Sequence, residues 1–191
     1  MQQPGHGLDA HETRTAAHKL FFALWPGEAV RVQIEERAKT LDGEHHPRGR
    51  LLKPARYHLT LHFLGEHADM SPRLIADVVS AAGRVQAPAF DLSLDQAGSF
   101  QNVWWLGSAR PPEGLKVLWQ TLGAELTHAR VTMAPSDTFT PHVTVVRDAT
   151  ARLSSTPIAP IQWRMREFVL IGSQPPRPYT ILHRWSLRGT E

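Results

Sequence analysis

The sequence predicts an α+β fold: a duplicated, two-lobed unit with antiparallel sheets that line a central cleft and helices packed outside. The four-residue phrase His-apolar-Thr-apolar occurs twice, at 58–61 and 142–145. Each copy lies in an alternating or β-branched stretch, which is typical of strands. Each copy also follows a segment with helical periodicity. Sequence identity between the halves is negligible outside the phrase, so the duplication is inferred from the order of elements.

The first half begins with a strand over 19–24 (KLFFAL). Pro26 and Gly27 interrupt it before an amphipathic helix. The apolar face of that helix is formed by Val30, Ile34, Ala38 and Leu41. A polar loop leads to the strand that carries His58, and Gly65 is expected to end this strand.

The second half is expected to alternate helices and strands in the same way. Ser71 before Pro72 predicts a helix N-terminus, because Ser favours the N-cap and Pro the first helical position. The further expected elements are a strand over 90–94, a hairpin over 99–106 that turns at 101–102, a helix over 112–128, the strand that carries His142, a loop rich in Ser, Thr and Pro, and closing strands over 166–171 and 179–187.

Composition and length limit the possible functions. Residues 1–17 lack apolar periodicity and predict a flexible N-terminal tail, and residues 18–191 are expected to form one bilobal domain. The absence of cysteine excludes disulfides, thiolate zinc sites and cysteine nucleophiles, and it fits a cytoplasmic location. The longest apolar run is too short to cross a membrane, and the N-terminus has no signal pattern. The net charge of +3 mildly favours a partner that carries phosphate.

The two phrases contain the equipment for acid–base chemistry. Alternation in a strand directs His58 and Thr60 to one face, and likewise His142 and Thr144. Imidazoles titrate near pH 6.5, so two of them can share one proton at neutral pH. Facing each other, the two strands would surround a small anion with an acid, a base and two hydroxyl donors, as metal-free phosphoester cleavage requires.

Cofactors are not expected. His62 shares the predicted face of His58 and Thr60, which raises the possibility of a metal site, but a catalytic zinc site normally takes three protein ligands and neither phrase contains a carboxylate. Glycine-rich phosphate loops are absent from the sequence, so an ATP-binding P-loop is excluded.

The paired phrases resemble the two HxTx signatures of the two-histidine (2H) phosphoesterase superfamily. Within it the chain looks most like the bacterial LigT-like RNA 2′,3′-cyclic phosphodiesterases, also called 2′-5′ RNA ligases. The similarity extends to the opening strand 19–24, to Lys53-Pro54, to Phe63-Leu64-Gly65 and to residues 139–147. One departure is Ala55-Arg56-Tyr57, where the family usually has an acidic-Asn-Leu run, and this leaves the substrate preference open.

The resemblance implies hydrolysis of a terminal RNA 2′,3′-cyclic phosphate to a 2′-phosphomonoester. It assigns His142 as the proton acceptor for water and His58 as the proton donor to the departing 3′ oxygen; the residues alone do not decide between these roles. Thr60 and Thr144 would donate hydrogen bonds to the non-bridging oxygens. Any ligase activity would be the same phosphodiester reaction in reverse.

Three further residues are candidates for substrate binding. Arg147 belongs to the family pattern, but strict alternation turns it away from the face of Thr144 unless a bulge or the strand end returns it; a solvated ion pair with Asp148 is the alternative. Lys53 could contact the RNA backbone, although loop lysines are usually only solvated. Phe22 could stack on a base, with core packing as the alternative.

Two other functions remain open. The same site could act on a small cyclic phosphate such as that of ADP-ribose, or the fold could be a nucleotide- or RNA-binding module without turnover. The presence of both histidines and both threonines favours an enzyme. No membrane or protein partner is implied, and we expect a monomer.

Overall fold

The computed structural model describes residues 17–135 and 138–188, and the predicted tail 1–17 lies outside them except for its last residue. In chain order the elements are β1 (His18–Leu24), α1 (Glu28–His45), β2 (Arg50–Leu51), the 3₁₀ helix η1 (Pro54–Arg56), β3 (Leu59–His67), α2 (Pro72–Ala82), β4 (Phe90–Phe100), β5 (Val103–Gly107), α3 (Glu113–His128), β6 (His142–Arg147), β7 (Thr156–Met165), β8 (Glu167–Ser173) and β9 (Thr180–Ser186). The α+β class is therefore confirmed. Among the described residues no helix combines the length and the apolar character that a membrane span needs.

All the strands belong to one bent sheet, in the order β7-β4-β5-β6-β3-β1-β8-β9, with β2 beside β6. Neighbouring strands are antiparallel throughout. At the centre, β3 and β6 are joined by one pair of residues, Leu59 and Val143. The two expected sheets are thus two halves of a single sheet, connected where the two His-x-Thr phrases meet.

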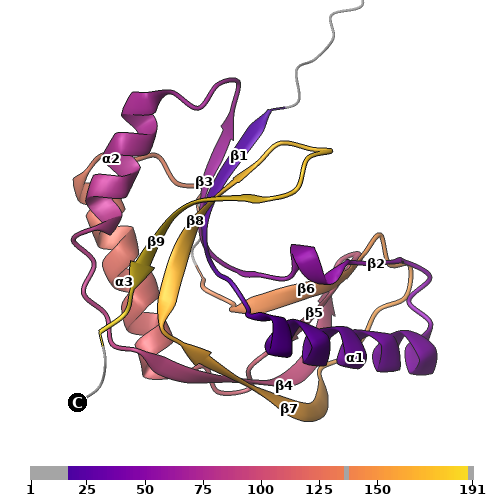
Figure 1. Cartoon of the computed structure of the whole chain (residues 1–191). Helices are drawn as coiled ribbons and strands as arrows, with labels where there is room; N and C mark the ends of the chain where they lie inside the picture. The colour runs from indigo at the N-terminus through magenta and orange to yellow at the C-terminus, as the bar shows by residue number, and fades with distance from the viewer. Residues whose placement is uncertain (1–16, 136–137, 189–191) are drawn as a thin grey trace, which may run out of the picture.

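Each half contributes a helix that covers strands of the other half. The order strand-helix-strand repeats as β1-α1-β3 and β5-α3-β6. Helix α1 packs on β6 and β7, whereas α3 contacts β3, α2 and β4. Figure 1 shows α2 and α3 side by side against one half of the sheet and α1 against the other. The repeated order of elements agrees with the duplication inferred from the sequence.

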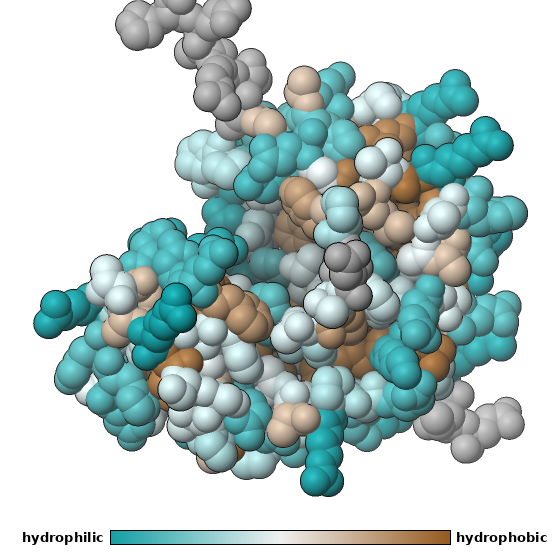
Figure 2. Space-filling model, turned by 180° about the vertical axis from the view of Figure 1, so that it is seen from behind, coloured by the Kyte–Doolittle hydropathy of each residue, from teal (hydrophilic) through white to brown (hydrophobic). Residues whose placement is uncertain are grey.

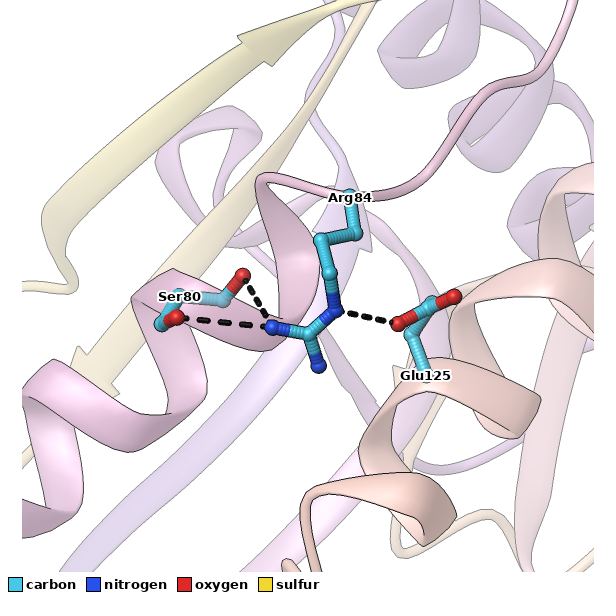
Figure 3. A network of polar contacts seen from close by, with 3 residues as sticks. All are labelled: Ser80, Arg84 and Glu125. Carbon is cyan, nitrogen blue, oxygen red and sulfur yellow. Dashed lines mark hydrogen bonds and ion pairs between the residues drawn. The ribbon is translucent and has the colours of Figure 1, made fainter.

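Helices α2 and α3 are connected by a polar network at the surface (Figure 3). Arg84, just after α2, donates from Nε to Glu125 Oε2 of α3 at 2.6 Å. Its Nη1 donates to the carbonyl and the hydroxyl oxygen of Ser80. At the other end of α2, the Ser71 hydroxyl accepts a hydrogen bond from the Leu74 amide at 3.2 Å, so the predicted N-cap is confirmed.

Strand β7 was not expected, because its segment reads as a loop rich in Ser, Thr and Pro. It contains Pro157 and Pro160, which have no backbone N–H to donate. A strand with a neighbour on each side would lose hydrogen bonds at both prolines. In the structure β7 is the edge strand beside β4, and proline is tolerated on an edge. Strand β4 also continues to Phe100, well beyond the predicted strand 90–94, and β3 continues past Gly65 to His67.

The sheet is apolar on both faces in its centre. The larger core lies between the sheet and the helices and includes residues of all three, such as Ile34, Val78 and Leu118. A smaller cluster on the opposite face comprises Phe21, Ala23, Val169 and Ile171, with Trp25, Phe63, Tyr179 and Ile181 packed against it. No residue of the described helices belongs to this second cluster, so it faces the cleft.

Candidate active site

The antiparallel pairing of Leu59 with Val143 sets the geometry of the two phrases. It places His58 across from Thr144, and Thr60 across from His142. Leu59 and Val143 are fully buried in the core on the helix side, so the four functional side chains project from the other face. A pseudo-two-fold axis between the paired residues therefore relates the two histidines.

Both imidazoles are held by the same hydrogen bond. His58 Nδ1 lies 2.8 Å from the carbonyl oxygen of Arg56, and His142 Nδ1 lies 2.8 Å from that of Thr140. A carbonyl oxygen only accepts, so Nδ1 carries the hydrogen in each ring. This leaves Nε2 of both rings to take up or release a proton toward a substrate.

The surroundings of the two rings favour their neutral forms. Burial is the main cause that lowers the pKa of His58, to about 4, and the cations Arg147 and Arg56 and the neighbouring His142 act in the same direction. Burial and Arg147 also lower the pKa of His142. Both rings are therefore neutral at pH 7 when no anion is present. A bound phosphate would reverse the effect of the cations and raise both pKa values.

A bulge after each threonine changes which residues reach this face. In β3 the register with β1 skips Leu61, and in β6 the register with β5 skips Val145. The residue three positions after each threonine consequently returns to the cleft, Phe63 in one half and Arg147 in the other. The bulge considered from the sequence is the arrangement found, and Asp148 pairs with Arg50 at 3.4 Å.

The same bulge turns His62 away from the site, so the prediction that it shares the face of His58 is wrong. His62 Nε2–H donates to the Trp119 carbonyl oxygen at 2.8 Å, and the ring stacks on the indole of Trp119 with centroids 5.4 Å apart. Within 17–135 and 138–188, His, Cys, Asp and Glu side chains nowhere form a group of three that could hold a metal ion.

A cavity of about 190 Å³ lies beside His58. Its lining residues are Lys19, Phe21, His58, Thr60, Phe63, Arg147, Ser173 and Tyr179. Two of them are cations, which suits an anionic ligand. Seen from behind in Figure 2, the surface is hollowed between the two halves of the molecule, with polar and apolar residues interspersed. Larger cavities of about 450 and 390 Å³ adjoin Trp119 and contain neither catalytic candidate.

Aromatic rings hold His58 in place. The ring of Phe21 lies 5.0 Å from the imidazole and that of Tyr179 lies 5.3 Å from it, edge to face. The guanidinium of Arg56 covers Tyr179 at 4.3 Å. Phe22, by contrast, is fully buried against Phe168, so base stacking by Phe22 is excluded and its core-packing alternative is correct.

A second pair of rings borders His142 and was missed from the sequence. Phe100 lies edge-on to the imidazole at 5.2 Å and stacks on Trp105 at 5.1 Å. Trp105 is the register partner of Thr144, and its Nε1 is buried without a hydrogen-bond partner in the described part of the chain. The indole fits because Gly98 lies beneath it: a Cβ there would come within 2.5 Å of Cζ2. Only the pairing of β5 with β6 would have revealed this neighbourhood.

Lys53 is not brought to the cavity. It is exposed at the start of η1 and does not belong to the lining residues. The contact that the sequence assigned to it stays a prediction.

Comparison with known proteins gives consistent matches over most of the chain. Residues 26–174 match the family model described as "2′-5′ RNA ligase superfamily". The RNA 2′,3′-cyclic phosphodiesterase of Escherichia coli K12 is 34% identical over 178 residues, which cover 88% of this chain and 96% of that protein. The crystal structure of apo LigT from E. coli superposes with a TM-score of 0.74 at 32% identity, over 90% of this chain and 98% of that one. A crystal structure of a Thermus thermophilus protein gives 0.72 at 25% identity, over 91% and 100% of the chains.

Proposed function

Because the chain belongs to the 2′-5′ RNA ligase superfamily, we propose that it hydrolyses RNA 2′,3′-cyclic phosphodiester ends to 2′-phosphomonoesters without a metal ion. The observation that carries this proposal is the pseudo-symmetric pair of imidazoles, each held through Nδ1, which leaves Nε2 available for proton transfer. The E. coli relative is named for this activity, and LigT has been solved with 3′-AMP and with phosphate.

The pseudo-two-fold axis suits an in-line displacement at phosphorus. His142 Nε2 takes a proton from water, whose oxygen forms the new bond to phosphorus. The bond from phosphorus to O3′ breaks, and His58 Nε2 gives its proton to O3′. The roles of the two histidines follow the family. Thr60 and Thr144 hydroxyls donate to the non-bridging oxygens, where negative charge grows, and Arg147 balances that charge.

Binding of the substrate leads to protonation of His58, the general acid. His58 is neutral in the empty site because burial and cations lower its pKa to about 4. The phosphate anion stabilises an imidazolium, so His58 acquires its proton as the substrate binds. The base and the acid are thereby distinguished only in the complex.

A product assay on an RNA that ends in a 2′,3′-cyclic phosphate, with EDTA present, tests the proposal. We expect a 2′-phosphate from the wild type and a loss of about 10²–10⁴-fold for His58→Ala and for His142→Ala. His128→Ala removes an exposed imidazole at the end of α3 and is the matched control. Loss of activity with EDTA would contradict the metal-independent scheme.

Other outcomes would identify the alternatives. Turnover of ADP-ribose cyclic phosphate but not of RNA would show that the substrate is a small cyclic phosphate and not an RNA end. Saturable binding of a cyclic nucleotide without product at any pH would make the protein a binding module. A second product assay in the presence of a 5′-hydroxyl RNA would detect the reverse, 2′-5′ ligation.

Three broader features belong to the same proposal. We propose that residues 18–191 act as one bilobal unit, which the continuous sheet supports. We also propose that the protein is a monomer in the cytoplasm, where a chain without cysteine needs no oxidising environment. Light scattering of the purified protein measures its oligomeric state.

A further inference from the structure

We infer that Lys19 and Ser173 form a subsite for the phosphate on the 5′ side of the reacting nucleotide. The site would then prefer a nucleotide that carries a 5′-phosphate, as every residue inside an RNA does, over a bare nucleoside 2′,3′-cyclic phosphate. The inference rests on the proposed function and adds to it a determinant of substrate choice.

Both residues line the same cavity as His58 and Thr60. Lys19 and Phe21 project to the same face of β1, and the Phe21 ring lies 5.0 Å from the His58 imidazole. Two residues along a strand span about 7 Å, a distance that one ribose and its flanking phosphates can bridge. A substrate whose cyclic phosphate lies between the histidines can therefore place its 5′-phosphate near Lys19.

Ser173 stands on β8 directly opposite Lys19 in the strand register. It is 4% exposed and is the one polar residue among the buried residues that the structure describes. Val169 and Ile171, which precede it on the same face of β8, belong to the apolar cluster of the cleft. A hydroxyl placed where this apolar strip reaches the cavity is a suitable donor to a phosphate oxygen.

An ion pair positions the ammonium group. Lys19 Nζ lies 2.9 Å from Glu66 Oε1, and the two side chains are 45% and 53% exposed. Gly65, with φ of +104°, lies in a register shift between β1 and β3 that sets Glu66 opposite Lys19. The carboxylate keeps Lys19 at the edge of the cavity, but it also competes with an incoming phosphate for the same donors.

Rates of hydrolysis of two substrates that differ by one phosphate test the subsite. They are a nucleoside 2′,3′-cyclic phosphate and the same compound with a 5′-phosphate. For the wild type we expect kcat/KM to be roughly 3- to 30-fold higher with the 5′-phosphate, the size of a charged hydrogen bond reduced by solvent exposure. A dinucleotide with the same cyclic end, whose internal phosphate replaces the terminal one, should share the preference.

Substitutions should move this ratio in opposite directions. Lys19→Met should bring it close to one and Lys19→Arg should keep it, while Ser173→Ala should lower it in part. Glu66→Gln removes the competing carboxylate and should raise it. Lys39→Met is the matched control, because Lys39 pairs with Glu35 on α1 and lies outside the cavity.

The outcomes distinguish a failure of the subsite from a failure of the proposed function. If the wild type hydrolyses both substrates equally well, or if Lys19→Met keeps the wild-type ratio, the subsite is wrong while the proposed function stands. If no cyclic phosphate is hydrolysed, the proposed function itself fails. If Lys19→Met loses all activity because it misfolds, Lys19→Arg decides instead: a folded protein that keeps the wild-type ratio supports the subsite, and one that loses it contradicts the subsite.

Discussion

At the scale of single residues, the two histidines have the same hydrogen bond but different surroundings. His58 is enclosed by Phe21 and Tyr179, whereas His142 touches Phe100. Burial and Arg147 lower the pKa of both, so at pH 7 in the empty site each ring is neutral, with its hydrogen on Nδ1 and none on Nε2. The catalytic proton must be acquired together with the anion.

This origin of the proton predicts the pH dependence of the reaction. The profile of kcat/KM, which reports the free enzyme, should be bell-shaped with its optimum below pH 6.5, because both pKa values lie below the ordinary one. The optimum of kcat should lie higher, since bound phosphate favours the imidazolium. Rates from pH 4.5 to 9 measure both, and the two apparent pKa values belong to the coupled pair. A flat profile would rule out the two-histidine scheme.

Arg147 should affect both histidines at once. Arg147→Met removes a cation that lowers both pKa values, so both should rise toward 6.5, while kcat/KM falls by about 10-fold or more through the lost charge on the phosphate. NMR titration of the imidazole Cε1 protons measures the pKa values. Arg50→Met, at the register partner of Arg147 and paired with Asp148, is the control that should leave them in place.

At the scale of elements, the bulges explain where sequence reasoning succeeded and where it failed. Alternation correctly grouped His58 with Thr60 and His142 with Thr144, since each pair precedes its bulge. Beyond Leu61 and Val145 the parity reverses, which misplaced His62 and left Arg147 undecided. A bulge depends on the pairing of two strands and has no signature in one of them.

Phe21, the ring that contacts His58, was missed from the sequence for a different reason. Strand β1 is buried on both faces from Leu20 onward, so its residues do not alternate between apolar and polar. Only the positions of the helices determine which ring reaches the cleft. Strand β7 was also missed. Its prolines are typical of a loop, and only its edge position in the sheet, which the sequence does not reveal, permits them in a strand.

The hairpin β4–β5 offers a test of close packing beneath the site. Gly98→Ala would place a Cβ 2.5 Å from Trp105 Cζ2, so the indole must shift; we expect a loss of roughly 1–3 kcal/mol in unfolding free energy. The reaction should also slow, because Trp105 supports Phe100 beside His142. Thermal unfolding and kcat measure the two effects.

Gly43→Ala is the matched control on α1. A Cβ at Gly43 meets nothing within 4 Å, so the substitution should stabilise the helix by a few tenths to about 1 kcal/mol. Equal stability of the two variants would show that the indole of Trp105 is free to move.

At the scale of the whole molecule, the neutral histidines link stability to pH. A histidine whose pKa is lowered by folding binds fewer protons in the folded state than in the unfolded one, so stability falls as the pH falls below 6.5. For His58 the loss extends to about pH 4 and amounts to roughly 1–3 kcal/mol. Urea unfolding at pH 7 and pH 4.5 measures it, and His58→Gln should reduce the difference. An unchanged difference would mean that other groups cause the loss.

The arrangement of the whole molecule could be predicted from the sequence only where it follows from elements that recur in both halves. The order strand-helix-strand and the two phrases predicted two related halves, and the apolar face of the first helix correctly predicted Ile34, Ala38 and Leu41 as buried. Nothing in either phrase specified that Leu59 pairs with Val143, which joins the halves into one sheet. That contact connects residues more than eighty positions apart, and no local pattern encodes it.

The exchange of helices between the halves has a consequence for the folding of each half. Helix α1 lies on β6 and β7, and α3 reaches β3, so each half relies on a helix of the other to cover its strands. A peptide with one His-x-Thr strand and one helix would expose its apolar sheet until a second copy supplied the missing helix. Neither half is therefore expected to fold when it is produced alone, whereas the two halves mixed as separate peptides could restore the whole sheet and bring the two histidines together.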